Sequence, residues 1–82
     1  MRKEVVLITG ANGEIGHGLI AHLGEQKNIS IVAMDVQPLD ECLQASCERF
    51  IQGDILDLML LGRLVAEYEI RSIFHLASIL ST

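Results

Sequence analysis

Two kinds of hydrophobic pattern alternate along this chain. Short, continuous apolar runs are separated by longer segments in which apolar residues recur every three or four positions. Continuous runs are typical of buried parallel strands, whereas the wider spacing is typical of amphipathic helices. The runs predict strands over residues 4–9, 29–35, 49–52 and 71–76. The wider spacing predicts a helix over residues 14 to about 27, and another from Asp57, as its N-cap, to about residue 69.

Each predicted helix has one apolar face, which we expect to lie in the core. On the first helix this face consists of Ile15, Leu19, Ile20 and Leu23, and on the second of Leu61, Leu64, Val65 and Tyr68. Residues 36–47 contain a proline and no clear period, so they are predicted as a connection with room for one helical turn.

Strands that alternate with helices predict an α/β fold with a parallel sheet and right-handed crossovers. We expect the strand order 3-2-1-4, which is that of the N-terminal half of a Rossmann-type sheet. The chain of 82 residues contains no repeat and no internal boundary, so residues 1–82 are predicted to belong to one domain.

Composition narrows the class of protein. Half of the residues are hydrophobic and the mean hydropathy is +0.40, which is high for a short chain because small domains expose much of their surface. No apolar run reaches the roughly 18 residues of a membrane helix, and the start does not resemble a signal peptide. A buried parallel sheet, or a piece of a larger core, explains the hydropathy.

Charge and cysteine content exclude further classes. A net charge of −5 with one Tyr, two Phe and no Trp argues against a nucleic-acid partner. Cys42 and Cys47 do not match a zinc pattern, so we expect no metal. We expect both to be free thiols, and a disulfide between them is the alternative. Free thiols are typical of a reducing compartment, which predicts a cytoplasmic protein.

A glycine turn follows the first predicted strand. Gly10, Gly13 and Gly16 lie between this strand and the first helix, with a first gap one residue longer than in G-x-G-x-x-G. Gly10 allows a sharp bend, and Gly13 allows close approach of a ligand. A helix N-terminus at such a turn favours phosphate. The alternative is a turn that is merely tight.

An acidic residue ends the second predicted strand. Asp35 lies 19 residues after Gly16 (35 minus 16), close to the roughly 20 expected for the acid that binds the adenosine ribose of a dinucleotide. Its carboxylate would repel a 2′-phosphate, and no Arg or Lys follows in residues 36–38. The pattern favours NAD over NADP, although an ordinary strand-end acid is the alternative.

Two further loops lie at the same predicted edge of the sheet. Asp54 and Ile55 follow the third strand, where a carboxylate can accept from the adenine amino group; the alternative is a solvated loop acid. Residues 76–78 follow the fourth strand with small side chains that leave room for the cofactor; the alternative is a loop made small by packing. His75 is predicted to be a partly buried structural residue, and Asn12 to bond the backbone of the turn.

These motifs together resemble the extended short-chain dehydrogenase/reductase family, which includes NAD-dependent sugar epimerases and dehydratases. The likeness rests on T-G-A-N-G-E-I-G at residues 9–16, Asp35, G-D-I-x-D at residues 53–57 and F-H-L-A-S at residues 74–78, and it covers the whole chain. The end of the chain is also similar to the short-chain type of threonine dehydrogenase and to nucleotide-sugar epimerase-like proteins, on fewer residues.

The resemblance implies a set of residues around NAD. They are Gly10, Asn12, Gly13, Glu14, Ile15 and Gly16 at the pyrophosphate, Asp35 and Val36 at the adenine ribose, Asp54 and Ile55 at the adenine, and Leu76, Ala77 and Ser78 along the riboses and phosphates. Ser78 departs from the family pattern, which has a small apolar residue there.

The catalytic Tyr-x-x-x-Lys of that family is absent, since the single tyrosine is Tyr68. We therefore expect no catalytic residue here, and an N-terminal part of a larger protein that lacks its catalytic and substrate-binding parts. The resemblance implies hydride transfer on a nucleotide sugar or a small hydroxy substrate, and leaves a homodimer open for the complete protein. The alternative function is a non-catalytic NAD-binding sensor or regulatory module.

Overall fold

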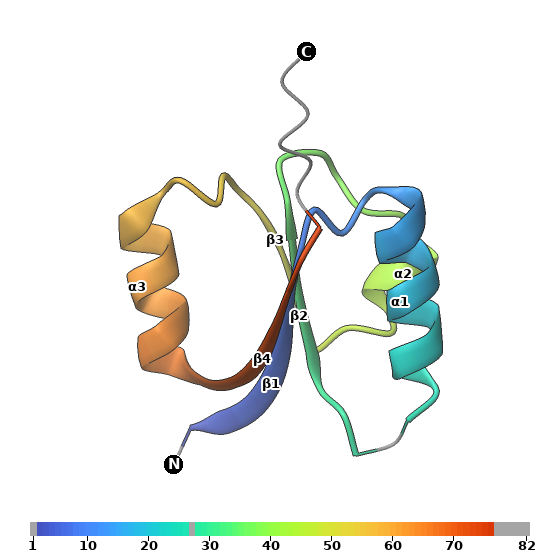
Figure 1. Ribbon diagram of the computed structural model, residues 1–82, viewed down its shortest axis with the longest axis horizontal. Helices are drawn as coiled ribbons and strands as arrows, with labels where there is room; N and C mark the ends of the chain where they lie inside the picture. Colours follow the sequence, from blue (N-terminus) through green and yellow to red (C-terminus); the bar gives the residue numbers. More distant parts are fainter. Residues whose placement is uncertain (1, 27, 77–82) are drawn as a thin grey trace.

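A computed structural model describes residues 2–26 and 28–76. Its elements are β1 (Lys3–Thr9), α1 (Glu14–Gly24), β2 (Ile31–Asp35), α2 (Glu41–Gln44), β3 (Arg49–Gln52), α3 (Leu58–Glu67) and β4 (Tyr68–His75). The strands form one sheet in the order β3-β2-β1-β4, and every neighbouring pair is parallel. Figure 1 shows α1 and α2 on one face of this sheet and α3 on the other. The predicted α/β fold and strand order are confirmed.

The core consists of two apolar clusters, one on each face of the sheet. Alternate residues of β1 supply both, because successive side chains of a strand point to opposite faces. Val5 and Leu7 pack with Leu64 of α3, whereas Ile8 packs with Ile20 of α1. The interior strand β1 is therefore buried on both faces, as its continuous apolar run predicted.

The boundary between α3 and β4 differs from the prediction. The helix ends at Glu67, and β4 begins at Tyr68 with extended backbone angles. Tyr68 is buried, as expected, but it lies in the strand opposite Lys3 of β1. Pairing with β1 therefore extends β4 toward its N-terminus and ends α3 early. The prediction placed Tyr68 in the helix because it lies seven positions, or two helical turns, after Leu61, but a buried tyrosine also fits a strand.

Two residues of the predicted apolar faces are exposed. Val65 is 55% exposed and Ile15 is 73% exposed. The buried residues of α1 are Gly16 and Ile20, four positions apart, so the contact face of this helix passes beside Ile15. In α3 the buried residue is Leu64, which turns the neighbouring Val65 outward.

Other boundaries shift by a few residues. The first helix ends at Gly24 rather than near residue 27, and β2 begins at Ile31 rather than at residue 29. The single helical turn for which the connection left room is α2, capped by Asp40, whose carboxylate accepts from the backbone N–H of Cys42 at 2.8 Å. Both cysteines are free. Among the described residues, none of the helices is long and apolar enough to cross a membrane.

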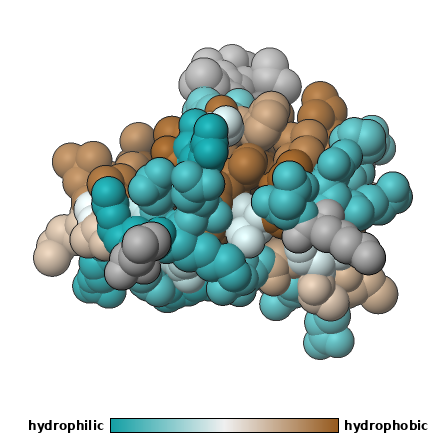
Figure 2. Space-filling model, turned by 90° about the horizontal axis from the view of Figure 1, so that it is seen from below, coloured by the Kyte–Doolittle hydropathy of each residue, from teal (hydrophilic) through white to brown (hydrophobic). Residues whose placement is uncertain are grey.

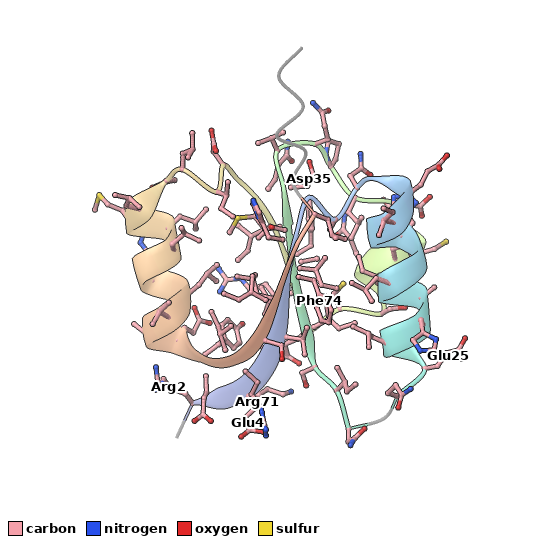
Figure 3. The ribbon with its side chains drawn as sticks, viewed as in Figure 1. Arg2, Glu4, Glu25, Asp35, Arg71 and Phe74 are labelled. Atoms are coloured by element: carbon pink, nitrogen blue, oxygen red, sulfur yellow. The ribbon has the colours of Figure 1, made fainter. Side chains whose placement is uncertain are left out.

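The fourth strand lies at an edge of the sheet and carries apolar side chains at the surface. Ile73 is 60% exposed and Phe74 is 39% exposed. The outer side of α3 adds Leu58 and Met59, at 78% and 75% exposure. Apolar residues gather in a band across the upper half of Figure 2, and Figure 3 shows Phe74 on β4. An uncovered apolar strand edge is a typical site for pairing with further chain.

A leucine-to-alanine substitution should lower the free energy of unfolding by different amounts on the buried and exposed sides of α3. Leu64→Ala removes a side chain that is 2% exposed, and should lower the free energy of unfolding by about 2–4 kcal/mol. Leu58→Ala in the same helix should change it by no more than about 0.5 kcal/mol. Urea denaturation followed by circular dichroism compares the two, and equal losses would contradict this packing of α3.

Candidate functional site

A cavity of about 700 Å³ lies at the carboxyl ends of the strands. The segments that follow all four strands line it, because parallel strands bring these ends to one edge of the sheet. Eight of the residues proposed from the sequence lie on its wall: Gly10, Asn12, Gly13, Asp35, Val36, Asp54, Ile55 and Leu76. Six further described residues line it: Thr9, Met34, Gln37, Gly53, Leu56 and His75.

The glycine turn forms one wall of this cavity. Gly10 has a φ of 70°, a left-handed conformation that favours glycine. The next residue, Ala11, donates its backbone N–H to the carbonyl of Met34 at 3.2 Å, which ties the turn to β2. Gly13 is the N-cap of α1 and forms no side-chain cap. The N-terminus of α1 therefore begins at the cavity wall, at Gly13, and has no capping side chain that would compete with an anion.

Gly16 has a packing role. A Cβ at this position would lie 2.3 Å from the carbonyl oxygen of Ala11, so only glycine lets α1 approach the turn this closely. Neither Gly16 nor its exposed neighbours Glu14 and Ile15 line the cavity. The predicted Ala77 and Ser78 lie outside the described residues.

Asp35 joins the end of β2 to the glycine turn. Its Oδ2 accepts from the backbone N–H of Asn12 at 2.8 Å, and its Oδ1 accepts from that of Gln37 at 2.9 Å. Figure 3 shows Asp35 at the upper end of the sheet, beside the turn. Each carboxylate oxygen has a second lone pair, so the group can hold the turn and still accept from ribose hydroxyls.

Asn12 contacts a different group from the one expected. Its Oδ1 lies 3.3 Å from Nε2 of His17, one turn into α1, so the side chain bridges to another side chain and not to the backbone of the turn. The backbone N–H of Asn12 supplies the bond that steadies the turn, through Asp35. Sequence spacing indicated the residue but not its partner.

The loop after β3 adds an apolar surface and a carboxylate. Asp54 is exposed, and its Oδ1 accepts from the backbone N–H of Leu56 at 2.9 Å. Ile55 is partly buried against the core. Gly53 donates its backbone N–H to the carbonyl of Asp35 at 2.9 Å, and a Cβ there would meet Leu60 at 2.6 Å. The end of β3 is thereby held beside the end of β2.

Thr9 and His75 contact each other on the side of the cavity formed by β1 and β4. Oγ1 of Thr9 and Nδ1 of His75 lie 2.6 Å apart, at paired positions of β1 and β4. Thr9 is 1% exposed, whereas His75 is exposed. The prediction of a partly buried His75 is therefore wrong, because β4 is an edge strand. Thr9 was missed, although its place directly before Gly10 was a signal for it.

The remaining titratable groups suggest no second centre. Within residues 2–26 and 28–76, no group of three or more His, Cys, Asp or Glu residues is arranged to hold a metal ion. Burial raises the pKa of the Cys47 thiol, which therefore stays protonated near neutral pH.

An open parallel sheet with a glycine turn, a strand-end acid and a cavity across its carboxyl edge defines a dinucleotide-binding class of fold. Residues 6–82 match the sequence profile of the NAD dependent epimerase/dehydratase family, and the chain belongs to this family. The family resemblance drawn from the sequence motifs is confirmed.

Curated relatives support this assignment. Short-chain dehydrogenase/reductase family 42E member 1 of Macaca fascicularis is 35% identical over 77 residues, which are 94% of this chain and 19% of the relative. Its Xenopus laevis counterpart is 37% identical over 76 residues, 93% of this chain and 19% of that protein. UDP-glucose 4-epimerase of Pasteurella multocida is 31% identical over 81 residues, 90% of this chain and 24% of that protein. The chain thus spans about a fifth to a quarter of these relatives.

Two glycines of α1 predict opposite effects of the same substitution. Gly16→Ala forces the new methyl against the carbonyl of Ala11 and should cost about 1–3 kcal/mol of unfolding free energy. At Gly18 a Cβ meets nothing within 4 Å, so Gly18→Ala should raise stability by about 0.5–1 kcal/mol. Thermal unfolding of both variants measures the difference, and a stabilised Gly16→Ala protein would refute the close approach.

Proposed function

We propose that this chain is the N-terminal part of an NAD-binding Rossmann domain and that the cavity holds the dinucleotide. The carrying observation is the carboxylate of Asp35, which lies on the cavity wall and accepts from the backbone of the glycine turn. Asp35 thereby joins the end of β2, which is suited to ribose hydroxyls, to the glycine turn, which is suited to phosphates.

Each part of NAD has its own set of proposed residues. The diphosphate binds the glycine turn and the first N–H groups of α1. Of the residues proposed for it, Gly10, Asn12 and Gly13 line the cavity, whereas Glu14, Ile15 and Gly16 do not. We assign the adenine ribose to Asp35 and Val36, and the adenine to Asp54 and Ile55. Leu76, Ala77 and Ser78 are assigned to the riboses and phosphates; Leu76 lines the cavity, and the other two lie outside the described residues. The glycine turn supports this placement, since Gly13 offers no side chain that would fill the phosphate position.

Charge supports NAD over NADP. Val36 and Gln37 follow Asp35 on the wall, and neither can pair with a 2′-phosphate. A carboxylate about 4 Å from a phosphate costs roughly 4 kcal/mol per unit charge at the effective dielectric constant of a protein surface. The family as a whole uses NAD(P), so this preference is a property that we assign to this chain.

The proposed NAD site indicates a function for the complete protein. We assign it as an NAD-dependent epimerase, dehydratase or dehydrogenase of a nucleotide sugar or a small hydroxy substrate; a relative named UDP-glucose 4-epimerase favours a nucleotide sugar. When bound, NAD would supply the hydride-transfer chemistry, and residues of this chain would bind and orient it. No catalytic residue is assigned to them.

The apolar edge supports a larger protein. Ile73 and Phe74 of β4 are exposed on opposite faces of the sheet, and the relatives are four to five times as long as the matched segment. Further strands and helices would cover both residues. The coding sequence beyond codon 82 tests this. An in-frame Tyr-x-x-x-Lys supports the enzyme, whereas a stop codon contradicts it and leaves the non-catalytic NAD-binding module as the function.

Removing one charge tests the cofactor preference. Asp35→Asn should weaken NAD binding and reduce the discrimination against NADP about tenfold or more, because the repulsion of the 2′-phosphate is lost. Asp40→Asn is the matched control, since Asp40 also accepts from the backbone N–H two residues later but does not line the cavity. Calorimetric titration with both cofactors measures the affinities. Wild-type preference for NADP would overturn the role of Asp35.

A further inference from the structure

The end of β1 is held on both of its sides. Toward β2, the turn after Thr9 is bonded by Ala11 to Met34 and by Asn12 to Asp35. Toward β4, the carbonyl of Thr9 accepts from the backbone N–H of Leu76 at 2.8 Å, and its hydroxyl contacts His75. The second contact is between side chains, so a substitution can remove it without touching the backbone ladder.

The buried hydroxyl decides which way this hydrogen bond runs. Thr9 is 1% exposed, and in the described part of the chain Nδ1 of His75 is the hydrogen-bond partner of its Oγ1. If Nδ1 carried the proton, it would donate to Oγ1 and leave the threonine proton buried without an acceptor, which is costly. If Nδ1 is unprotonated, the threonine hydroxyl donates to it and both groups are satisfied. The exposed ring then carries its proton on Nε2.

We propose that His75 is a positioning residue for the dinucleotide, acting through Thr9 on the phosphate-binding turn. This inference rests on the proposed function. Thr9 directly precedes Gly10, the left-handed residue at which the chain leaves the sheet, and both Thr9 and His75 line the cavity. The hydrogen bond keeps the β4 wall against the start of the turn, so the N–H groups that meet the diphosphate are held in place before it binds.

A pair of isosteric variants separates this role from packing. Thr9→Val keeps the shape but leaves Nδ1 facing a methyl group. It should weaken NAD binding about threefold to tenfold, the range of one neutral hydrogen bond. Binding of adenosine, which lacks the diphosphate, should stay within about twofold of the wild type. Thr9→Ser restores the hydroxyl and should restore NAD affinity. Titration of the 82-residue chain, monitored by NMR, measures all of these affinities.

A double-mutant cycle adds a second readout. His75→Phe removes Nδ1 and keeps an aromatic ring, so the variant that carries both changes should bind NAD no more weakly than Thr9→Val alone. Additive losses would overturn the proposal. So would an unchanged NAD affinity of Thr9→Val, or an equal loss of adenosine binding, which would indicate a general structural defect.

The imidazole itself provides a readout that needs no variant. Nitrogen-15 spectra of wild-type His75 should show the proton on Nε2 and an unprotonated Nδ1, and a proton on Nδ1 would refute the proposal even if Thr9→Val fails to fold. Absence of NAD binding by the wild type would overturn the proposed function. The tautomer would then report on the hydrogen bond alone.

Discussion

The parallel pairing of β1 between β2 and β4 is the constraint on which the rest of this structure depends. It buries the central strand on both faces, with Val5 and Leu7 toward α3 and Ile8 toward α1. It also brings the carboxyl ends of three adjacent strands, and of β3 beyond them, to one edge. A cavity at that edge is a consequence of strand direction, since antiparallel neighbours would send every other loop to the far side.

Polar contacts between the strand ends fix the positions of the loops that form the cavity wall. Asp35 reaches the turn after β1, Gly53 donates to the carbonyl of Asp35, and Thr9 meets His75 across the β1–β4 pair. Each contact joins the end of one strand to the end of its neighbour. All of these contacts are made within the protein, and contacts that order a binding wall lower the cost of ordering it on binding.

Much of this was predictable from local patterns. Continuous apolar runs identified the four strands, and the glycine spacing with Asp35 identified the edge at which they end. Predictions of single residues failed in two situations. In one, the hydrophobic spacing fits both a helix and a strand; in the other, the predicted apolar face is wider than the side of the helix that the sheet buries. Tyr68 matched the helical period but joined β4, and Ile15 matched it but lies beside the face that contains Gly16 and Ile20.

The sequence by itself determined the order of elements, the parallel sheet, the glycine turn and the acid at the end of β2, because each is encoded in residues close together along the chain. Only the tertiary structure decided that Gly16 must lack a Cβ against Ala11, that Asp35 accepts from Asn12, and that Thr9 meets His75. The last two contacts join residues 23 and 66 positions apart. No local period records such contacts, because they depend on how strands distant in the chain are placed side by side.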